Sequence, residues 1–343
     1  MKKRFVTFGE VMLRLNPEGY LRLSQADRLV TSYAGGEANV AVSLAQFGED
    51  VSFVTKLPDN DLGRAARNAV RKFGVKTDDI VWGGPRLGVY FLEKGASQRP
   101  SKVIYDRAGS SIALAKRSDF DWKSIFRGVG WFHVTGITPA LGGELPQICL
   151  DALKLCRERK ITVSCDLNYR GKLWTREEAG RAMAKLVPFV DVLIANESDA
   201  ADVFGIRARG SDVEKGTIDK AGYVSVAEQL VERFGCRMAA ITLRTSISAS
   251  DNKWSGLLYD GKAKKAYFAP EYDVRIVDRV GGGDSFGGGL VYALANGYRP
   301  QAAIDFAVAA SCLKHSIESD FNLVTVEEVA ALAAGNASGR VQR

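Results

Sequence analysis

Apolar and polar positions in the middle of the chain follow two different periods. Short apolar runs such as Val51–Thr55 have the length and composition of buried strands, whereas Leu62–Phe73 repeats its apolar residues at helical spacing. Asn60 or Asp61 would cap that helix. Further strands are predicted at 129–134, 161–165, 191–195 and 238–243, and further helices at 143–159, 176–186 and 224–234. Strands that alternate with helices of this length predict a mostly parallel sheet covered on both faces.

Two stretches break this rhythm. Residues 11–34 alternate apolar and polar positions without a convincing helix, and residues 86–108 contain two strand-like runs, Gly88–Leu92 and Lys102–Tyr105, joined by a polar turn. We interpret these two inserts as a small sheet that stands off the main body, and we call them the lid. Such a flap could exclude water from a site beneath it, although an ordinary edge hairpin would give the same pattern. A further antiparallel pair is predicted at 251–269.

Composition is that of a folded globular protein. The chain has 343 residues, of which 46% are hydrophobic and 25% charged, so it can bury a large core. We predict one domain over residues 1–335 and a flexible tail over 336–343. No apolar run approaches the roughly 18 residues of a membrane span. The basic start is followed by only a short apolar run, which predicts a first strand rather than a signal peptide, and hence a cytoplasmic protein without membrane contact.

Charge and metal-ligand residues exclude several classes of function. The net charge is +7, but the basic residues are dispersed and the five tryptophans form no stacking platform, so we expect no nucleic-acid partner. The five cysteines include no C-x-x-C pair and are interpreted as core residues. His133 and His315 are too far apart in sequence for a zinc site. We interpret His133 as a packed strand residue and His315 as a residue on a helix surface.

The stretch richest in candidate chemistry is Asp278–Phe286. There an apolar run ends in three glycines and an acid, after which a helical apolar pattern begins. Glycines allow the backbone to come close to a ligand, and amides at a helix start attract anions. Gly281, Gly282 and Gly283 would therefore form an anion hole for a phosphoryl group in transfer. Asp284 could accept the proton of a substrate hydroxyl.

Other interpretations of this stretch are available. A dinucleotide site would require G-x-G-x-x-G in an early strand–helix–strand unit, and a P-loop would require G-x-x-x-x-G-K-[ST], which the chain lacks. The third alternative is a helix start at which Asp284 only caps backbone amides. The stretch by itself does not decide between a catalytic base and a cap.

Two signatures resemble those of a known family. Asp278–Phe286 resembles the C-terminal signature of the ribokinase-like (PfkB) carbohydrate kinases, usually written D-T-x-G-A-G-D-x-F, with Gly282 in place of the alanine. Ala34–Ala41 resembles the N-terminal signature G-G-x-x-x-N-x-A, with Ala34 in place of the first glycine. The signatures have the family's order and separation, and the resemblance covers nearly the whole chain.

This resemblance implies a fold, an activity and cofactors. The implied fold is a three-layer α/β/α sandwich with a mostly parallel central sheet and a small β-sheet lid. The implied activity is a kinase that uses ATP and Mg²⁺, and the resemblance leaves open whether a monovalent cation such as K⁺ assists. The implied nucleotide-binding residues are Asn168, Asn196, Thr242, Arg244, Gly281, Gly282 and Gly283. Asn196 and Asp199 resemble the family's N-x-x-E element, and the shorter Asp199 would support the metal through water.

The sugar side of the site is implied by a subgroup of the family. Asp166–Trp174 resembles the D-x-N-x-R…L-W segment of fructokinases and 2-keto-3-deoxygluconate kinases, in which Arg170 could hold a phosphate or a carboxylate with two hydrogen bonds. Residues at positions resembling Tyr90, Tyr105 and Arg107 bind the sugar acid in the latter kinases. The implied substrate-binding residues are Gly35, Gly36, Asn39, Tyr90, Tyr105, Arg107, Arg170 and Asp284, and the implied catalytic residues are Asp284, Gly281, Gly282, Gly283 and Arg170.

The resemblance therefore predicts an ATP-dependent kinase that phosphorylates the terminal hydroxyl of a sugar acid, 2-keto-3-deoxygluconate, to the 6-phosphate. Arg107 would pair with the carboxylate that fructose and ribose lack, unless Asp106 neutralises it. A fructokinase, ribokinase or nucleoside kinase of the same family is an alternative, and so is a non-catalytic sugar or nucleotide sensor. Lid strands in this fold often pair between subunits, so we expect a homodimer or a higher homo-oligomer.

Overall fold

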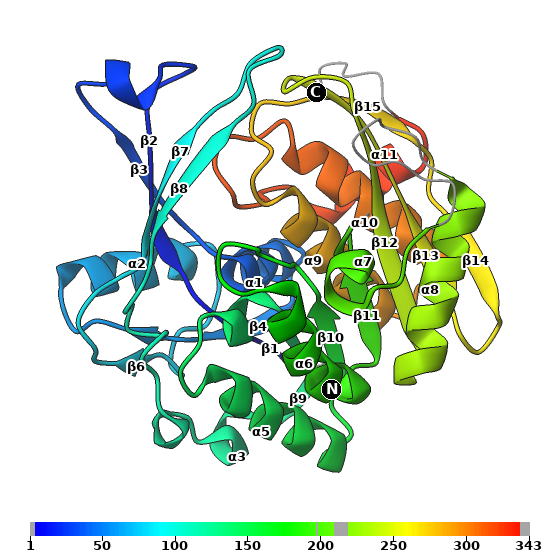
Figure 1. Ribbon diagram of the computed structural model, residues 1–343, viewed down its shortest axis with the longest axis horizontal. Coiled ribbons are helices and arrows are strands. Elements are labelled where there is room, and N and C mark those ends of the chain that lie inside the picture. Colours follow the sequence, from blue (N-terminus) through cyan, green and yellow to red (C-terminus); the bar gives the residue numbers. More distant parts are fainter. Residues whose placement is uncertain (1–3, 197, 209–218, 337–343) are drawn as a thin grey trace.

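The computed structural model describes residues 4–196, 198–208 and 219–336 (Figure 1). These residues form a central nine-stranded sheet with the order β14-β13-β12-β11-β10-β9-β1-β4, and β15 pairs with β13. The six strands from β4 to β12 in this order pair in parallel, and antiparallel pairings add the other three at one edge. The strands are β1 (Arg4–Phe8), β4 (Asp50–Val54), β9 (Val129–Thr135), β10 (Thr162–Asp166), β11 (Val192–Ala195), β12 (Met238–Ser246), β13 (Asp251–Asp260), β14 (Lys265–Phe268) and β15 (Tyr272–Arg275).

Helices cover both faces of this sheet and complete the three layers. One buried cluster lies under α1 (Gly36–Gln46), α2 (Asp61–Arg71), α9 (Gly282–Ala295), α10 (Pro300–Lys314) and α11 (Val326–Ala333). The other lies under α3 (Trp122–Ile125), α5 (Leu145–Glu158), α6 (Arg176–Leu186), α7 (Asp199–Phe204) and α8 (Lys220–Phe234). The short helix α4 (Ile137–Ala140) follows β9, and a small pair, β5 (Lys56–Leu57) and β6 (Val81–Trp82), lies apart from the sheet. The predicted fold class is confirmed.

Helix α1, which lines the pocket, is among the helices that the hydrophobic pattern does not predict. Its residues from Glu37 to Leu44 are all buried. A helix that is buried on every side has no polar stripe, so it lacks the periodicity by which helices are found in a sequence. The predicted helix at 62–73, by contrast, is amphipathic and corresponds to α2. Asn60 caps it as predicted, because its side-chain oxygen accepts a hydrogen bond from the amide of Gly63 at 3.0 Å.

The two lid inserts meet in one sheet. Strands β2 (Met12–Asn16), β3 (Val30–Ala34), β7 (Val89–Glu93) and β8 (Lys102–Asp106) have the order β3-β2-β7-β8. Each insert contributes an antiparallel pair, and the parallel pairing of β2 with β7 joins the two inserts. Figure 1 shows this sheet projecting from the body at the upper left. The predicted small sheet is therefore present, and it stands apart from the central one.

The far end of the lid touches the body again. The amide of Ser97, in the turn between β7 and β8, donates to the hydroxyl of Ser250 at 3.0 Å, and the carbonyl of Ser97 accepts from the amide of Ala249 at 2.7 Å. Ser250 and Ala249 belong to the loop between β12 and β13. The lid is thus hydrogen-bonded to the body at its tip as well as at its base.

The direction of the chain crossovers reverses at β1. This strand pairs in parallel with β4 on one side and with β9 on the other. In open α/β sheets such a reversal leaves a crevice at the carboxyl ends of the strands, and ligands bind there. Gly9 and Glu10 follow β1, and Gly136 follows β9, so these residues border the crevice. Among the described residues, no helix combines the length and the apolar character needed to cross a bilayer.

Candidate active site

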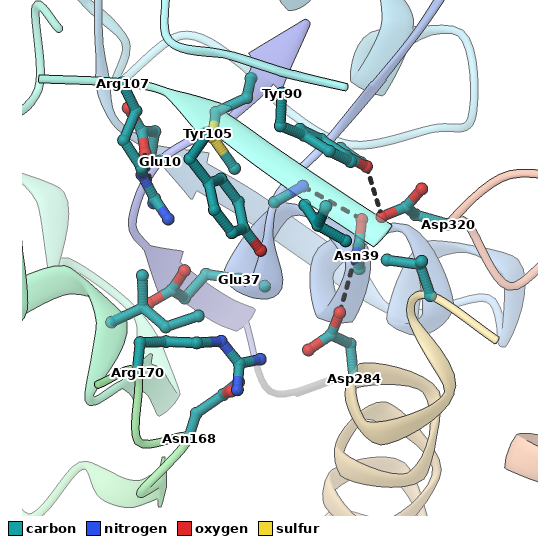
Figure 2. A pocket seen from close by; sticks show the side chains of 17 residues that line it. Glu10, Glu37, Asn39, Tyr90, Tyr105, Arg107, Asn168, Arg170, Asp284 and Asp320 are labelled. Carbon is teal, nitrogen blue, oxygen red and sulfur yellow. Dashed lines mark hydrogen bonds and ion pairs between the residues drawn. The ribbon is translucent and has the colours of Figure 1, made fainter. Parts of the chain in front are cut away.

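A pocket lies at this crevice, between the lid and the body (Figure 2). The predicted site residues that line it are Gly35, Gly36, Asn39, Tyr90, Tyr105, Arg107, Asn168, Arg170 and Asp284. The lining residues that we did not predict as part of the site are Glu10, Met12, Ala34, Glu37, Val103, Ile137, Val280 and Asp320. All of the predicted substrate-binding residues therefore come together in one place, although they are spread over the length of the chain.

Asp284 lies in the pocket, in the first turn of α9. Its Oδ2 accepts a hydrogen bond from Asn39 Nδ2 at 2.6 Å (Figure 2), and Asn39 Oδ1 in turn accepts from the amide of Gly35 at 3.3 Å. Desolvation raises the pKa of Asp284 to about 6, a shift that the hydrogen bond from Asn39 opposes. The nearby carboxyl of Asp320 also raises this pKa, and the guanidinium of Arg170 lowers it. A carboxylate with a pKa close to neutral pH is suited to accept a proton during catalysis.

The start of α9 leaves backbone amides available. Gly281 is the N-cap, and no side chain caps the helix, so the capping interpretation of Asp284 is wrong. The amide of Gly282 donates to the carbonyl of Arg279 at 3.3 Å. The amides of Gly283 and Asp284 have no backbone acceptor among the described residues. These two amides and the positive end of the helix dipole are available to attract an anion. The anion hole predicted at Gly281, Gly282 and Gly283 stays a prediction, and none of the three glycines is among the residues that line the pocket.

Two of the three glycines are required by close packing. Gly281 has a φ of +84°, and a Cβ atom built on it would come within 2.0 Å of the carbonyl oxygen of Asp320. A Cβ atom on Gly282 would come within 2.7 Å of the His315 ring, whereas one on Gly283 would meet nothing within 4 Å. Gly35 is similarly constrained, because a Cβ atom there would come within 1.8 Å of the Glu10 carbonyl oxygen.

Tyr90 and Asp320 lie on the side of the pocket that is at the top of Figure 2, and Asp320 accepts hydrogen bonds from Tyr90 and from the buried Arg14. The hydroxyl of Tyr90 donates to Asp320 Oδ2 at 2.8 Å (Figure 2), and Arg14 Nη1 donates to Asp320 Oδ1 at 2.5 Å. Arg14 Nη2 also donates to Asp278, the first residue of the C-terminal signature. Burial raises the pKa of Asp320, and Arg14 counteracts this shift. A lid strand is thus connected by ion pairs to the loop that precedes α9 and to the loop that follows α10.

Arg107 has an acidic partner that we did not predict. Its Nε donates to Glu10 Oε2 at 2.7 Å, and its Nη2 donates to the same oxygen. The other oxygen of Glu10 accepts from the hydroxyl of Ser110 at 2.6 Å. The alternative in which Asp106 neutralises Arg107 is wrong, because Asp106 pairs with Arg86 at 2.8 Å. Arg107 also lies over the ring of Tyr105, at 5.4 Å from its centroid, so an ion pair and an aromatic ring fix its guanidinium.

Arg170 is the less constrained arginine of the pocket. Its Nη1 donates to the carbonyl of Tyr169 at 3.2 Å, which is its side chain's one hydrogen bond to the residues that the structure describes. In Figure 2 its guanidinium points between Asp284 and Asn168. The backbone of Asn168 is left-handed, with a φ of +41°, and its amide donates to Asp166 Oδ1 at 3.0 Å. This turn directs Arg170 toward the carboxylate of Asp284.

The residues predicted to support Mg²⁺ lie outside the pocket and are engaged with the backbone. Asp199 is buried, and its oxygens accept from the amides of Tyr169 at 3.1 Å and Asn196 at 3.0 Å. Asn196 Oδ1 accepts from the amides of Ser198 and Asp199. Direct metal contact does not fit these hydrogen bonds, and the described residues include no group of three or more His, Cys, Asp or Glu that could hold a metal.

Thr242 and Arg244 lie on β12, next to the strand that precedes Asn196. Neither residue lines the pocket of Figure 2. Arg244 is close enough to Arg279, beside the glycines, to lower the pKa of Arg279 together with burial. These cations lie on the side of α9 where the lid tip meets the β12–β13 loop, since Arg279 Nη2 donates to the carbonyl of Ala249 at 3.3 Å. The predicted nucleotide residues Asn196, Thr242 and Arg244 are thus separate from the predicted sugar residues.

His315 is not on a helix surface, so that interpretation is wrong. It is the residue after α10, it is buried, and its ring packs on Trp254 with 5.1 Å between centroids. Nδ1 donates to the carbonyl of Ser311 at 2.7 Å, and burial lowers the pKa of His315 to about 4. The ring packs against the backbone of Gly282, where any side chain would collide with it. His133 is a packed strand residue, as interpreted from the sequence.

Glu37 is a pocket residue without a sequence signal of its own. It lies in the N-terminal signature at a position where the family pattern specifies no residue type. Its Oε1 accepts from the hydroxyls of Thr135 at 2.8 Å and Thr138 at 2.6 Å. Burial raises the pKa of Glu37. These contacts join the start of α1 to the end of β9, and so they fix one wall of the pocket.

The comparisons with known proteins agree with this geometry. The profile of the pfkB family carbohydrate kinases matches residues 2–319. The chain belongs to this family. A 2-dehydro-3-deoxygalactonokinase of Haloferax volcanii is 32% identical over 340 residues, which cover 99% of both chains. A 2-dehydro-3-deoxygluconokinase of Thermoproteus tenax is 27% identical and covers 92% of this chain and 89% of its own.

Solved structures of carbohydrate kinases have the same fold. The crystal structure of 2-dehydro-3-deoxygluconokinase from Thermotoga maritima is 51% identical, has a TM-score of 0.94, and covers 98% of this chain and 99% of its own. A fructokinase of Xylella fastidiosa, solved with bound ATP, is 21% identical with a TM-score of 0.75 and is similar in fold. The kinase prediction is confirmed, and this protein is a carbohydrate kinase.

Proposed function

We propose that this kinase transfers the γ-phosphoryl group of ATP to the terminal hydroxyl of a 2-keto-3-deoxy sugar acid. The observation that carries the proposal is the pocket itself, in which Asp284 lies beside free helix amides. Arg170 and the remaining Nη1 of Arg107, whose charge Glu10 compensates, can donate hydrogen bonds to an acid. A neutral sugar has no carboxylate for these guanidinium groups. Three of the four proteins named above act on 2-keto-3-deoxy acids, by their names, which supports the same substrate class here.

The proposed reaction uses few residues. Asp284 accepts the proton of the terminal hydroxyl while that oxygen forms a bond to the γ-phosphorus and the bond from phosphorus to the ADP oxygen breaks. The amides of Gly283 and Asp284 face the charge that develops on the phosphoryl oxygens. Arg170 would orient the same group or the sugar. The lid would exclude water, which otherwise competes with the sugar hydroxyl as the acceptor.

The carboxylate of the acid is assigned to Arg107. Glu10 holds Nε and Nη2 of this guanidinium, so Nη1 is the nitrogen left for a substrate oxygen. Tyr105 would contact the acid beside it, and Tyr90 and Asp320 would contact hydroxyl groups farther along the chain of the sugar. The gluconic and galactonic acids differ in configuration at one of those hydroxyls, C4. The panel of substrates should therefore include both acids.

ATP is proposed to lie on the other side of α9, toward Asn196, Thr242 and Arg244. The cations Arg244 and Arg279 near the glycines support a polyphosphate there. Mg²⁺ would arrive with the phosphates and keep most of its water, because Asn196 and Asp199 are occupied by backbone amides. Added K⁺ is not part of this proposal.

We propose a homodimer that forms through the lid. Strand β8 is an edge of the lid sheet, and Ile104 and Tyr105 on it are exposed by 42% and 38%. An edge strand with apolar side chains favours pairing with a second copy. Size-exclusion chromatography with light scattering would measure the mass, and a monomer at micromolar concentration would refute the dimer.

The first experiment is a coupled ADP-release assay with Mg·ATP. The panel holds 2-keto-3-deoxygluconate, 2-keto-3-deoxygalactonate, fructose, ribose and adenosine. We expect turnover on one or both acids and none on the neutral compounds. Turnover on a neutral sugar alone would refute the sugar-acid proposal but leave the kinase, and silence across the panel would refute the proposed substrate class.

A variant pair tests the carboxylate assignment. Arg107→Ala should raise KM for the acid strongly, because the pairing with the substrate carboxylate is lost. Arg86→Ala is the matched control, since Arg86 is a lid arginine whose partner Asp106 lies outside the pocket. Equal effects of the two substitutions would assign Arg107 to lid stability instead of substrate binding.

A further inference from the structure

Lys314 is a fully buried lysine that the proposed reaction does not use. It is the last residue of α10, and its exposed fraction is 0%. Its Nζ donates to the carbonyl of Asp278 at 3.0 Å and to the carbonyl of Ile317 at 3.4 Å. Lysine is almost never fully buried unless its charge is compensated. Burying an ammonium group costs free energy, so we expect Lys314 to have a structural or functional role that offsets this cost.

The two carbonyls belong to the two loops that carry the active-site backbone. One loop leads from β15 into the glycines of α9, and the other follows α10 and contains Asp320. The loops are joined by hydrogen bonds from the amide of Val277 to the carbonyl of His315 at 2.8 Å and from the amide of Ser319 to Asp278 Oδ2 at 3.2 Å. The ammonium of Lys314 adds a further link between them.

The charges around Lys314 require a second cation. Arg14 is the guanidinium that pairs with both Asp278 and Asp320, and the side chains of all three are at most 4% exposed. Two carboxylates and one guanidinium leave one negative charge, which a protonated Lys314 balances. Burial lowers the pKa of Lys314, while Asp278, Asp320 and Asp284 raise it and Arg14 lowers it. Asp284 is a further acid near this group, so the ammonium of Lys314 offsets part of the negative charge of the cluster.

We propose that the ammonium of Lys314 is a built-in monovalent cation, which positions the glycine loop and Asp320 and makes the kinase independent of added K⁺. Backbone carbonyl oxygens are the ligands by which proteins hold K⁺, and here a tethered cation already occupies two of them. A free ion cannot enter the same place while Lys314 fills it. Lys314 is a positioning residue, since it does not line the substrate pocket. This proposal rests on the proposed kinase function in the activity tests, but not in the measurement of the melting temperature.

The wild-type enzyme gives the first test. The rate is measured at constant ionic strength in tetramethylammonium chloride and again with KCl, NaCl or NH₄Cl in its place. We expect the same kcat in all four salts, because the internal cation is always present. A severalfold activation by K⁺ or NH₄⁺ would overturn the proposal.

A substitution gives the second test. Lys314→Met keeps the length of the side chain but removes its charge, so we expect kcat to fall by about a hundredfold as the loops shift. K⁺ or NH₄⁺, but not tetramethylammonium, should restore part of that activity and also raise the melting temperature of the variant. Lys56→Met is the matched control, because Lys56 is a largely buried lysine paired with Asp119 away from the pocket. Its melting temperature should not respond to the choice of cation.

The outcomes separate this proposal from the proposed function. If Lys314→Met loses activity and stability without any recovery in small cations, Lys314 is only a structural residue and the proposal is overturned. If the variant does not fold, the salt independence of the wild type decides. If the wild type phosphorylates nothing in the panel, the proposed function fails, and a cation-specific rise in the melting temperature of Lys314→Met would still support the tethered cation.

Discussion

At the scale of the residue, Asp284 is the group on which the chemistry depends. Asp284→Asn removes the proton acceptor but keeps the size of the side chain, so we expect kcat to fall by about 10²–10⁴-fold. ATP binding and the melting temperature should be nearly unchanged, because the anion hole consists of backbone amides. Steady-state kinetics and calorimetry measure the two effects. A variant with a near-normal rate would exclude Asp284 as the base.

The pKa of Asp284 predicts a pH dependence. Burial raises this pKa to about 6, and only the ionised form can accept the proton. Activity should therefore be full above pH 7 and fall as the pH drops through 6, by about tenfold for each further unit. A pH profile of kcat/KM checks this. Asn39→Ala removes the hydrogen bond that lowers the pKa, so it should move the acidic limb to higher pH; an unmoved limb would assign the titration to another group.

Some site residues could be found from the sequence and others could not. Asp284, Asn39 and the glycines lie inside short signatures, so local sequence identifies them. Glu10 and Asp320 act through partners that are distant in the chain, Arg107 and Arg14. Nothing local in the sequence indicates which arginine a buried acid will pair with, because such pairing depends on the register of the lid over the body.

At the scale of the element, the start of α9 makes a sharp prediction about glycine. Gly282→Ala places a methyl group 2.7 Å from the His315 ring, whereas Gly283→Ala places one in open space. We expect the first substitution to lower stability by about 1–3 kcal/mol through overpacking. The second should leave stability unchanged or slightly raised, since alanine favours helix. Thermal unfolding of the two variants measures the difference, and equal melting temperatures would show that His315 can move aside.

Most strands of the central sheet and several of its helices could be predicted from the hydrophobic pattern. Strands β4, β9, β10, β11 and β12 and helices α2, α5, α6 and α8 lie at or close to their predicted ranges, because each has one apolar side or is apolar throughout. Helix α1 escaped the pattern because it is buried all round. Burial in the interior of a three-layer sandwich thus removes the very signal that identifies an amphipathic helix.

At the scale of the whole molecule, Arg14 connects the lid to the body. Arg14→Met would leave Asp278 and Asp320 as buried carboxylates without this partner. We expect a loss of about 3–5 kcal/mol of unfolding free energy. Arg64→Met is the control, because the exposed pair of Arg64 with Asp59 should contribute at most about 1 kcal/mol. Urea unfolding compares the two, and similar losses would refute the special role of the buried pair.

The architecture could be predicted from the sequence because alternating strands and helices permit few arrangements. The meeting of the two lid inserts could be proposed in the same way, from two strand-rich stretches that interrupt the alternation. The contact of the lid tip with the β12–β13 loop could not, since it consists of hydrogen bonds of Ser97 with Ser250 and Ala249. Serines in polar turns carry no information about their partners.

The parallel pairing of β2 with β7 also bears on the order in which the chain folds during synthesis. The β2–β3 hairpin leaves the ribosome first, but a two-stranded hairpin is marginally stable alone. Its next partner, β7, follows only after β4 and α2 of the body have been made. The lid can therefore mature only once part of the body exists. All four lid strands nevertheless leave the ribosome before β9, so the lid sheet can pair while most of the central sheet is still to be made.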